Sequence, residues 1–271
     1  MKARLINIRE IARLIFLEGF RRHTILGLAV LAIATEASGF LFMDFFGRDL
    51  GNPVNDFIFS IMWFVGFVFI FFHAVQIMAW DVERGFIFPL LARPVSRTDY
   101  VIGVFAGLSA LLACLQLLLG ILGFLTLIWI KGSVAATFFP ELSVAHYLYA
   151  FFSLLAYQLL LIAVVMLLSS AIRGSFPVLV LSFAYYGIAS GLPVVRSMLG
   201  TSDQQHALQY ILTLLAALFP NPSTYDLKAD VLTVASNLTA LEIAAGFGSA
   251  FLYMVIALWL ACLLYGRRDL S

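Results

Sequence analysis

FIFSIMWFVGFVFIFFHAVQIMAW (Phe57–Trp80), DVERGFIFPLLARPVSRTDY (Asp81–Tyr100) and VIGVFAGLSALLACLQLLLGILGFLTLIWI (Val101–Ile130) are the three consecutive stretches that decide the fold. A helix that crosses a bilayer needs about 20 apolar residues, because each residue adds about 1.5 Å along the helix axis. Both outer stretches are long enough to cross. The polar stretch between them is therefore predicted to lie at a membrane surface.

Composition supports a membrane protein. The chain is 63% hydrophobic and 11% charged, whereas a soluble domain has roughly 45–50% apolar and about 25% charged residues. A protein of 271 residues cannot hide so much apolar surface in its own core, so lipid must cover the excess. The net charge of +1 excludes a polybasic nucleic-acid-binding protein. Cys114 and Cys262 both fall in apolar runs, and neither they nor the four histidines have the spacing of a metal site.

The sequence predicts an all-α membrane protein that forms a single domain over residues 1–271. Six apolar runs reach or approach the spanning length: Thr24–Phe46, Phe57–Trp80, Val101–Ile130, Tyr147–Ile172, Phe176–Val195 and Ile243–Tyr265. A seventh run, Ala207–Phe219, is too short to cross and is followed by Pro220. We expect it to form an interfacial or re-entrant helix within the segment 196–242 between the last two spans.

The distribution of basic residues orients these spans. With both termini inside, 12 of the 16 basic residues lie on the inner face and 4 on the outer face. The inner ones are Lys2, Arg4, Arg9, Arg13, Arg21, Arg22, Arg84, Arg93, Arg97, Arg173, Arg267 and Arg268; the outer ones are Arg48, Lys131, Arg196 and Lys228. Cytoplasmic loops carry the excess of Lys and Arg. We therefore expect cytoplasmic termini and an extracytoplasmic segment 196–242.

Residues 1–23, ahead of the first span, are predicted to form a helix on the inner membrane surface. Ile8, Ile11 and Ile15 share one face of such a helix, and Arg9 and Arg13 share another. An apolar face opposite a basic face is typical of helices that lie in the membrane interface. A solvated basic tail is the alternative.

Several polar residues fall inside the predicted spans, where unpaired polar atoms are costly. These candidates are Glu36, His73, Gln76, Ser182, Tyr185, Tyr186 and Ser190. They are predicted either to line a substrate pathway or subunit seam, or to satisfy one another locally between helices. We expect Glu36 and His73 to face the protein interior or a seam rather than lipid. Gly187 and Gly191 lie four residues apart, a spacing that favours close helix packing.

The polar stretch 81–100 has the pattern of a short amphipathic helix closed by a turn. An acidic start is followed by Gly85, a short apolar run and then Arg-Pro-Val-Ser-Arg at residues 93–97. A surface helix held between two spans suits the transmission of force from a soluble partner.

This arrangement resembles that of ABC-2 type transporter permeases. The resemblance is carried by Glu83, Gly85, Leu90-Leu91, Pro94-Val95-Ser96-Arg97, Tyr100 and Gly103. The tail Tyr265-Gly266-Arg267-Arg268-Asp269-Leu270 is similar to the endings of the branch that contains NosY-like and GldF-like permeases.

The resemblance implies a bacterial inner-membrane permease that works with a separate cytoplasmic ABC ATPase and a second permease copy or paralogue. ATP and Mg²⁺ would bind that ATPase, and this chain would bind no cofactor or metal and have no catalytic residues of its own. The sequence lacks the GxxxxGK[ST] phosphate loop. The expected ATPase-coupling residues are Asp81, Glu83, Arg84, Gly85, Phe86, Phe88, Leu90, Pro94 and Arg97.

Three functions remain open from the sequence. The first is the permease of an ATP-driven exporter, in which the resemblance implies a pathway lined mainly by the first, second and fifth spans. The second is a mechanotransmission subunit that acts on a periplasmic partner without moving a substrate. The third is an intramembrane enzyme that uses Glu36 and His73 as acid and base, although no nucleophile or second carboxylate accompanies them.

The topology can be tested by labelling single cysteines in a background that lacks Cys114 and Cys262. Cysteines placed at Arg97 and at Lys228 are expected to react with a membrane-impermeant thiol reagent from opposite sides of the membrane, because the charge distribution assigns them to opposite faces. Labelling of both positions from the same side would contradict the predicted topology.

Overall fold

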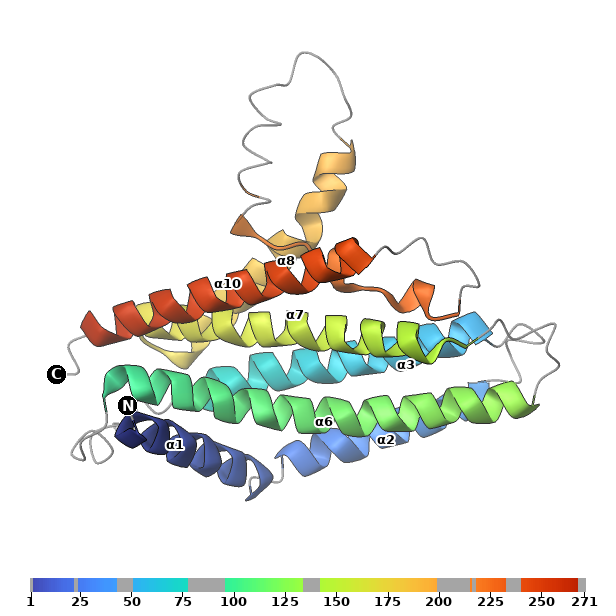
Figure 1. Cartoon of the computed structure of the whole chain (residues 1–271), viewed down its shortest axis with the longest axis horizontal. Helices are drawn as coiled ribbons and strands as arrows, with labels where there is room; N and C mark the ends of the chain where they lie inside the picture. The colour runs from blue at the N-terminus through green and yellow to red at the C-terminus, as the bar shows by residue number, and fades with distance from the viewer. Residues whose placement is uncertain are drawn as a thin grey trace, which may run out of the picture.

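In the computed structural model, residues 2–21, 24–42, 51–77, 96–133, 142–198, 215, 218–232 and 240–267 are described. Every regular element in these ranges is helical (Figure 1). Five helices of the described part are long and apolar enough to span a membrane: Gly51–Ile77, Arg97–Gly132, Val144–Ala171, Ser175–Val195 and Leu241–Arg267. They correspond to five of the six predicted runs.

The remaining predicted run, Thr24–Phe46, contains α2 (Thr24–Phe42), a helix of 19 residues. Ahead of it, α1 (Lys2–Arg21) forms the predicted N-terminal helix. Other expectations lie outside the described residues: the end of the first run (43–46), the stretch 81–95, and nearly all of the short run Ala207–Phe219.

Helix α3 (Gly51–Val68) begins six residues earlier than the predicted start at Phe57. Its first turn contains Pro53. A proline is tolerated there because the first N–H groups of a helix have no intrahelical partner. Because Asn52 and Asn55 are polar, this turn does not form part of an apolar run, and the sequence pattern did not predict it.

The same span contains an irregularity that the apolar pattern did not predict. Residues Phe69–Ala74 form a π-helix, η2, and the Val75 N–H donates to the Ile70 carbonyl five residues earlier. The wider turn holds one extra residue, and such π-bulges occur frequently at functional sites. His73 lies in this segment and is only 3% exposed.

Helix α6 (Arg97–Ser133) is the longest element. The Asp99 N–H donates to Ser96 Oγ at 3.1 Å, so Ser96 caps the helix. Arg97 and Tyr100 therefore form the first turn of α6, which corrects the expectation that they belong to a surface helix over 81–100. Residues 97–100 of the predicted polar stretch therefore belong to α6.

The other long helices are α7 (Val144–Ala171), α8 (Ser175–Met198) and α10 (Ala240–Arg267). Helix α7 packs closely along α10, and α6 contacts α1, α3, α7 and α10. Helix α1 begins and α10 ends at the end of the bundle where α6 begins (Figure 1). Gly187 and Gly191 of α8 have nothing within 4 Å of an added Cβ among the described residues, so the close packing predicted for them is not formed there.

Helix α1 docks against α6 through the isoleucine face that the sequence predicted. A Cβ added at Gly103 would lie 2.7 Å from the Cβ of Ile11. One added at Gly107 would lie 2.7 Å from the Cβ of Ile15 and 2.9 Å from the Ala12 carbonyl oxygen. Small residues four apart allow such close approach of two helices. The face that was expected to cover membrane surface therefore covers α6.

This contact predicts that Gly103→Val destabilises the protein. The added side chain must push α1 away from α6, and overpacking of this kind costs roughly 1–3 kcal/mol. We expect a lower thermal inactivation temperature in detergent and faster proteolysis of α1. Gly132→Val is the matched control, because Gly132 lies in the same helix with nothing within 4 Å of its added Cβ. Equal stability of the two variants would contradict the docking of α1.

Candidate functional site

The N-terminal end of α6 meets the C-terminal end of α10. Arg97 Nη1 donates to the Gly266 carbonyl at 3.3 Å and lies 3.5 Å from the Tyr265 carbonyl. The rings of Tyr100 and Tyr265 stack at a centroid distance of 5.7 Å. The last carbonyls of a helix lack intrahelical partners and carry partial negative charge, so an arginine both satisfies and stabilises them. We call these residues, with Ser96, the junction.

The junction explains two patterns that the sequence showed separately. Ser96, Arg97 and Tyr100 come from the end of the polar stretch, whereas Tyr265 and Gly266 come from the C-terminal tail. Their contact joins segments more than 160 residues apart in the sequence. Since α1 packs on the same end of α6, the polar stretch leads directly into a point where three helices are held together.

A second feature is a cavity of about 400 Å³ near the other end of the bundle. Helices α3, α7 and α8 line it together with a segment that contains two short 3-10 helices, η5 (Pro222–Tyr225) and η6 (Lys228–Asp230). Its volume lies in the range of about 300–1,000 Å³ found for small-molecule sites. The aromatic and polar residues that line it include Phe59, Trp63, Tyr186, Ser190, Tyr225 and Asp226.

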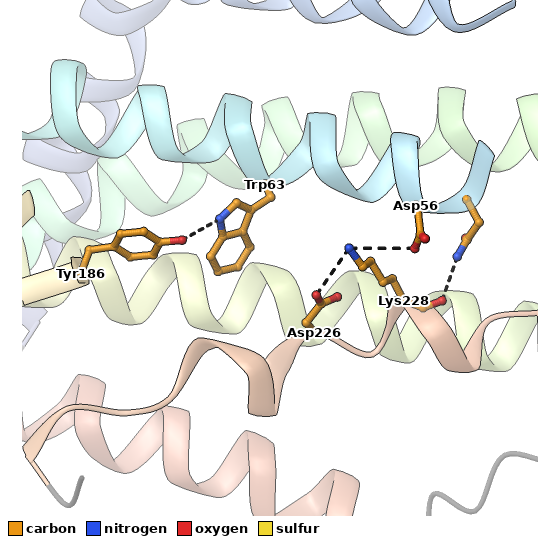
Figure 2. Close-up of polar contacts among 6 residues, drawn as sticks. Asp56, Trp63, Tyr186, Asp226 and Lys228 are labelled. Atoms are coloured by element: carbon orange, nitrogen blue, oxygen red, sulfur yellow. Dashed lines mark hydrogen bonds and ion pairs between the residues drawn. The ribbon is translucent and has the colours of Figure 1, made fainter. Parts of the chain in front are cut away.

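Aromatic side chains form much of the cavity wall. The Trp63 indole N–H donates to the Tyr186 hydroxyl at 3.1 Å, linking α3 to α8 (Figure 2). Trp63 also stacks on Tyr157 of α7, with ring centroids 5.3 Å apart. Tyr157 in turn lies 5.1 Å from the ring of Tyr225. These contacts fix the orientation of the indole that faces the cavity.

Charged groups lie beside this wall. Lys228 Nζ is 3.9 Å from Asp56 Oδ1 and 3.7 Å from Asp226 Oδ2 (Figure 2). The two acidic side chains are about half exposed, and ion pairs of this kind contribute only about 0–1 kcal/mol to stability. One ammonium between two carboxylates leaves the trio with a net negative charge.

Besides the Lys228–Asp56 ion pair and the Tyr157–Tyr225 contact, hydrogen bonds attach the segment 221–232 to the bundle. Asn55 Nδ2 of α3 donates to the Lys228 carbonyl at 2.8 Å, and the Ser143 N–H, just before α7, donates to the Val231 carbonyl at 3.4 Å. The hydroxyls of Tyr225 and Ser249 are 2.9 Å apart, which joins the segment to α10. Burial raises the pKa of Tyr225 above the ordinary value for tyrosine, so its hydroxyl is neutral at physiological pH.

A buried polar node ties the three central helices together beside the cavity wall. Gln116 of α6 and Gln158 of α7 donate through Nε2 to the Met62 carbonyl of α3, at 2.8 and 3.2 Å. Both amides are almost fully buried. Gly66 is required beside them, because an added Cβ would overlap the Gln158 amide. Amides that cross between helices stabilise membrane bundles without a buried charge.

The predicted site residues are distributed unevenly over these features. Tyr186 and Ser190 line the cavity and Arg97 forms the junction. Ser182 and His73 are buried, Tyr185 packs against Phe219 at 4.9 Å, and Gln76 is exposed. The side chain of Glu36 lies outside the described residues, as do Asp81, Glu83, Arg84, Gly85, Phe86, Phe88, Leu90 and Pro94.

Sequence reasoning missed Asn55, Trp63, Asp226 and Lys228. Trp63 was one of many aromatic residues in an apolar run, and Asp226 and Lys228 stood in a segment rich in turn residues. A sequence pattern does not indicate that this segment folds back over α3. The only signal was Asn221-Pro222, which predicts a turn before η5.

A family model described as ABC-2 family transporter protein matches residues 25–270. The chain belongs to this family. It is a multi-pass membrane protein and a membrane subunit of an ABC transporter, and the family implies an ABC ATPase as its partner. The comparison with individually curated proteins gave no match.

The attachment of segment 221–232 can be tested at Asn55. Asn55→Ala removes the donor to the Lys228 carbonyl, so we expect faster amide hydrogen exchange in peptides covering 221–232, with little change in α6 and α7. Asn52→Ala is the matched control, because Asn52 lies in the first turn of the same helix and is exposed. Unchanged exchange in Asn55→Ala would show that this hydrogen bond does not hold the segment.

Proposed function

We propose that this chain is the transmembrane permease subunit of an ATP-driven ABC exporter, and that a separate cytoplasmic ATPase binds the polar stretch 81–100. The observation that carries the proposal is the junction. Any partner that moves the polar stretch must also move the first turn of α6, to which it is covalently joined. Arg97 and Tyr100 transfer that movement to the end of α10.

In the proposed topology α2 is a sixth span, and both termini are cytoplasmic in the bacterial inner membrane. The distribution of 12 basic residues inside and 4 outside supports this orientation. The start of α1, the start of α6 and the end of α10 lie at one end of the bundle (Figure 1). The junction would then face the cytoplasm, and the cavity and segment 221–232 would lie on the extracytoplasmic side.

The proposed coupling residues form a polar group and an apolar group. Asp81, Glu83 and Arg84 would make polar contacts with the ATPase, and Gly85 would allow close backbone approach. Phe86, Phe88 and Leu90 would fill an apolar cleft on it, with Pro94 ending the segment. ATP and Mg²⁺ would be held by the ATPase alone.

A second copy of the chain, or a paralogue, would complete the transporter. Helices α8 and α10 expose apolar side chains along much of their length, including Phe176, Leu181, Ile188, Phe251 and Trp259. Lipid or a second permease must cover these faces in the membrane. Of the pathway candidates, Glu36, Gln76, Tyr185, Tyr186 and Ser190 would face the pathway or the seam between the copies, whereas His73 and Ser182 are buried within one copy.

Mechanotransmission to a periplasmic partner is the second candidate, and one observation favours it. Segment 221–232 is bonded to α3, to the start of α7 and to α10, so movement of these helices would also move the segment. A periplasmic partner bound to this segment would be moved with it, without passage of a substrate across the membrane.

The proposed function predicts that Arg97→Ala uncouples the transporter. Loss of the bond to the Gly266 carbonyl leaves only the stack of Tyr100 on Tyr265 to link the start of α6 to the end of α10 within the junction. ATPase activity of the reconstituted complex should therefore lose much of its dependence on the permease while the subunits still co-purify. We expect a decrease of about tenfold in permease-stimulated ATPase activity, which corresponds to a rise of about 1.4 kcal/mol in activation free energy.

Arg267→Ala is the matched control for this experiment. It removes an arginine from the last turn of α10, where the side chain is exposed. Normal stimulation by Arg97→Ala would contradict the role of the junction. Failure of the wild-type chain to bind any ABC ATPase would contradict the proposed function itself.

A further inference from the structure

We propose that the cavity between α3, α7, α8 and segment 221–228 binds an organic ammonium ion that carries an apolar body. The site lies within a single copy of the chain. Its binding step requires neither ATP nor the ATPase, so the inference goes beyond the proposed function.

The walls of the cavity match the apolar body and the charge of such a ligand. Phe59, Trp63, Tyr186 and Tyr225 all line it. Aromatic faces attract cations through the negative charge of their π-systems, and groups of aromatic rings are the usual receptors for alkylammonium ions. The bond from Trp63 to Tyr186 and the stack of Trp63 on Tyr157 hold the indole in place before a ligand arrives. A preorganised wall loses little conformational entropy on binding.

The charge beside the cavity selects for a cation. Asp226 lines the cavity and Asp56 lies beside it, and both are within 4 Å of the Lys228 ammonium. Lys228 is the only basic residue among those that line the described cavity, and its charge is more than balanced by the two carboxylates. An anionic ligand that approached Lys228 would meet both carboxylates, whereas a cation would be attracted by them.

A polar contact is also provided on α8. Ser190 lies one turn after Tyr186 and lines the same cavity. Its Oγ is buried and has no hydrogen-bond partner among the described residues. The partial negative charge of this oxygen would attract any ammonium ion in the cavity. A protonated amine would in addition donate a hydrogen bond to it, which satisfies an atom that is otherwise costly to bury. Aromatic walls, an acidic rim and an unsatisfied acceptor thus indicate the same class of ligand.

The test measures binding of radiolabelled benzyltrimethylammonium to the permease in nanodiscs by equilibrium dialysis, with empty nanodiscs used to subtract partition into lipid. We expect saturable binding to the wild-type chain. Asp226→Asn should weaken it by about 3- to 10-fold, because it removes a charge that attracts the cation, and Trp63→Leu should weaken it by a similar factor. Neopentylbenzene, the uncharged isostere, should not compete at the same concentration.

Matched controls separate the cavity from other surfaces. Asp230→Asn removes an acid that does not line the cavity, and Trp259→Leu removes an exposed tryptophan on α10; both should bind as the wild type does. Trp63 packs on Tyr157, so a folding defect could affect Trp63→Leu, but Asp226 is exposed and carries no such risk.

The proposal is overturned by any of three results: no saturable binding to the wild type, equal binding by Asp226→Asn, or equal competition by neopentylbenzene. Each of these leaves the ATPase experiment with Arg97→Ala unaffected. Conversely, if the chain binds the cation but no ABC ATPase, the result supports the proposed cation site and contradicts the proposed function.

Discussion

The apolar core of a bilayer offers no hydrogen-bond partners, so every backbone polar group within it must be satisfied by the protein. Polar side chains are costly there as well, and in the described part of the chain several of them gather where they can bond one another or the backbone. Midway along the bundle, Gln116 and Gln158 share the Met62 carbonyl. The larger polar clusters lie toward the two ends, at the junction of α6 with α10 and at the cavity under segment 221–232. In the described part of the chain, packed helices connect the two clusters.

Those helices are suited to carry movement between the two ends. Helix α6 extends from the junction to the far end of the bundle, and α3 and α7 are tied to it by the glutamine node and by the hydrogen bond from Tyr147 to the Gly120 carbonyl at 2.7 Å. The α7 helix then packs along α10, which returns to the junction. Movement at the junction therefore has a continuous path, through close-packed side chains, to the aromatic wall and to the segment that covers it. The π-helix η2 (Phe69–Ala74) follows α3 directly and contacts α7 and α8.

Sequence reasoning predicted the membrane class, five of the spans and the isoleucine face of α1, because apolar runs and helical periodicity are local properties. It misplaced the start of α3, where Gly51, Asn52 and Pro53 precede Val54 in the first turn and interrupt the apolar pattern. It assigned Arg97 to a separate surface helix, although the capping by Ser96 places it in α6. The cavity could not be predicted, since its residues come from three helices and a loop. Only tertiary contacts, such as that of Asn55 with the Lys228 carbonyl, bring these residues together.

The central claim is that an ABC ATPase binds the cytoplasmic end of the bundle at the polar stretch beside the junction. The most direct test places a photo-crosslinking amino acid at Phe88 or at Lys228 in cells that express the transporter, and identifies the adducts by mass spectrometry. The account predicts that Phe88 captures a protein with a GxxxxGK[ST] phosphate loop and that Lys228 does not. Capture of the ATPase from Lys228, or none from Phe88, would contradict it.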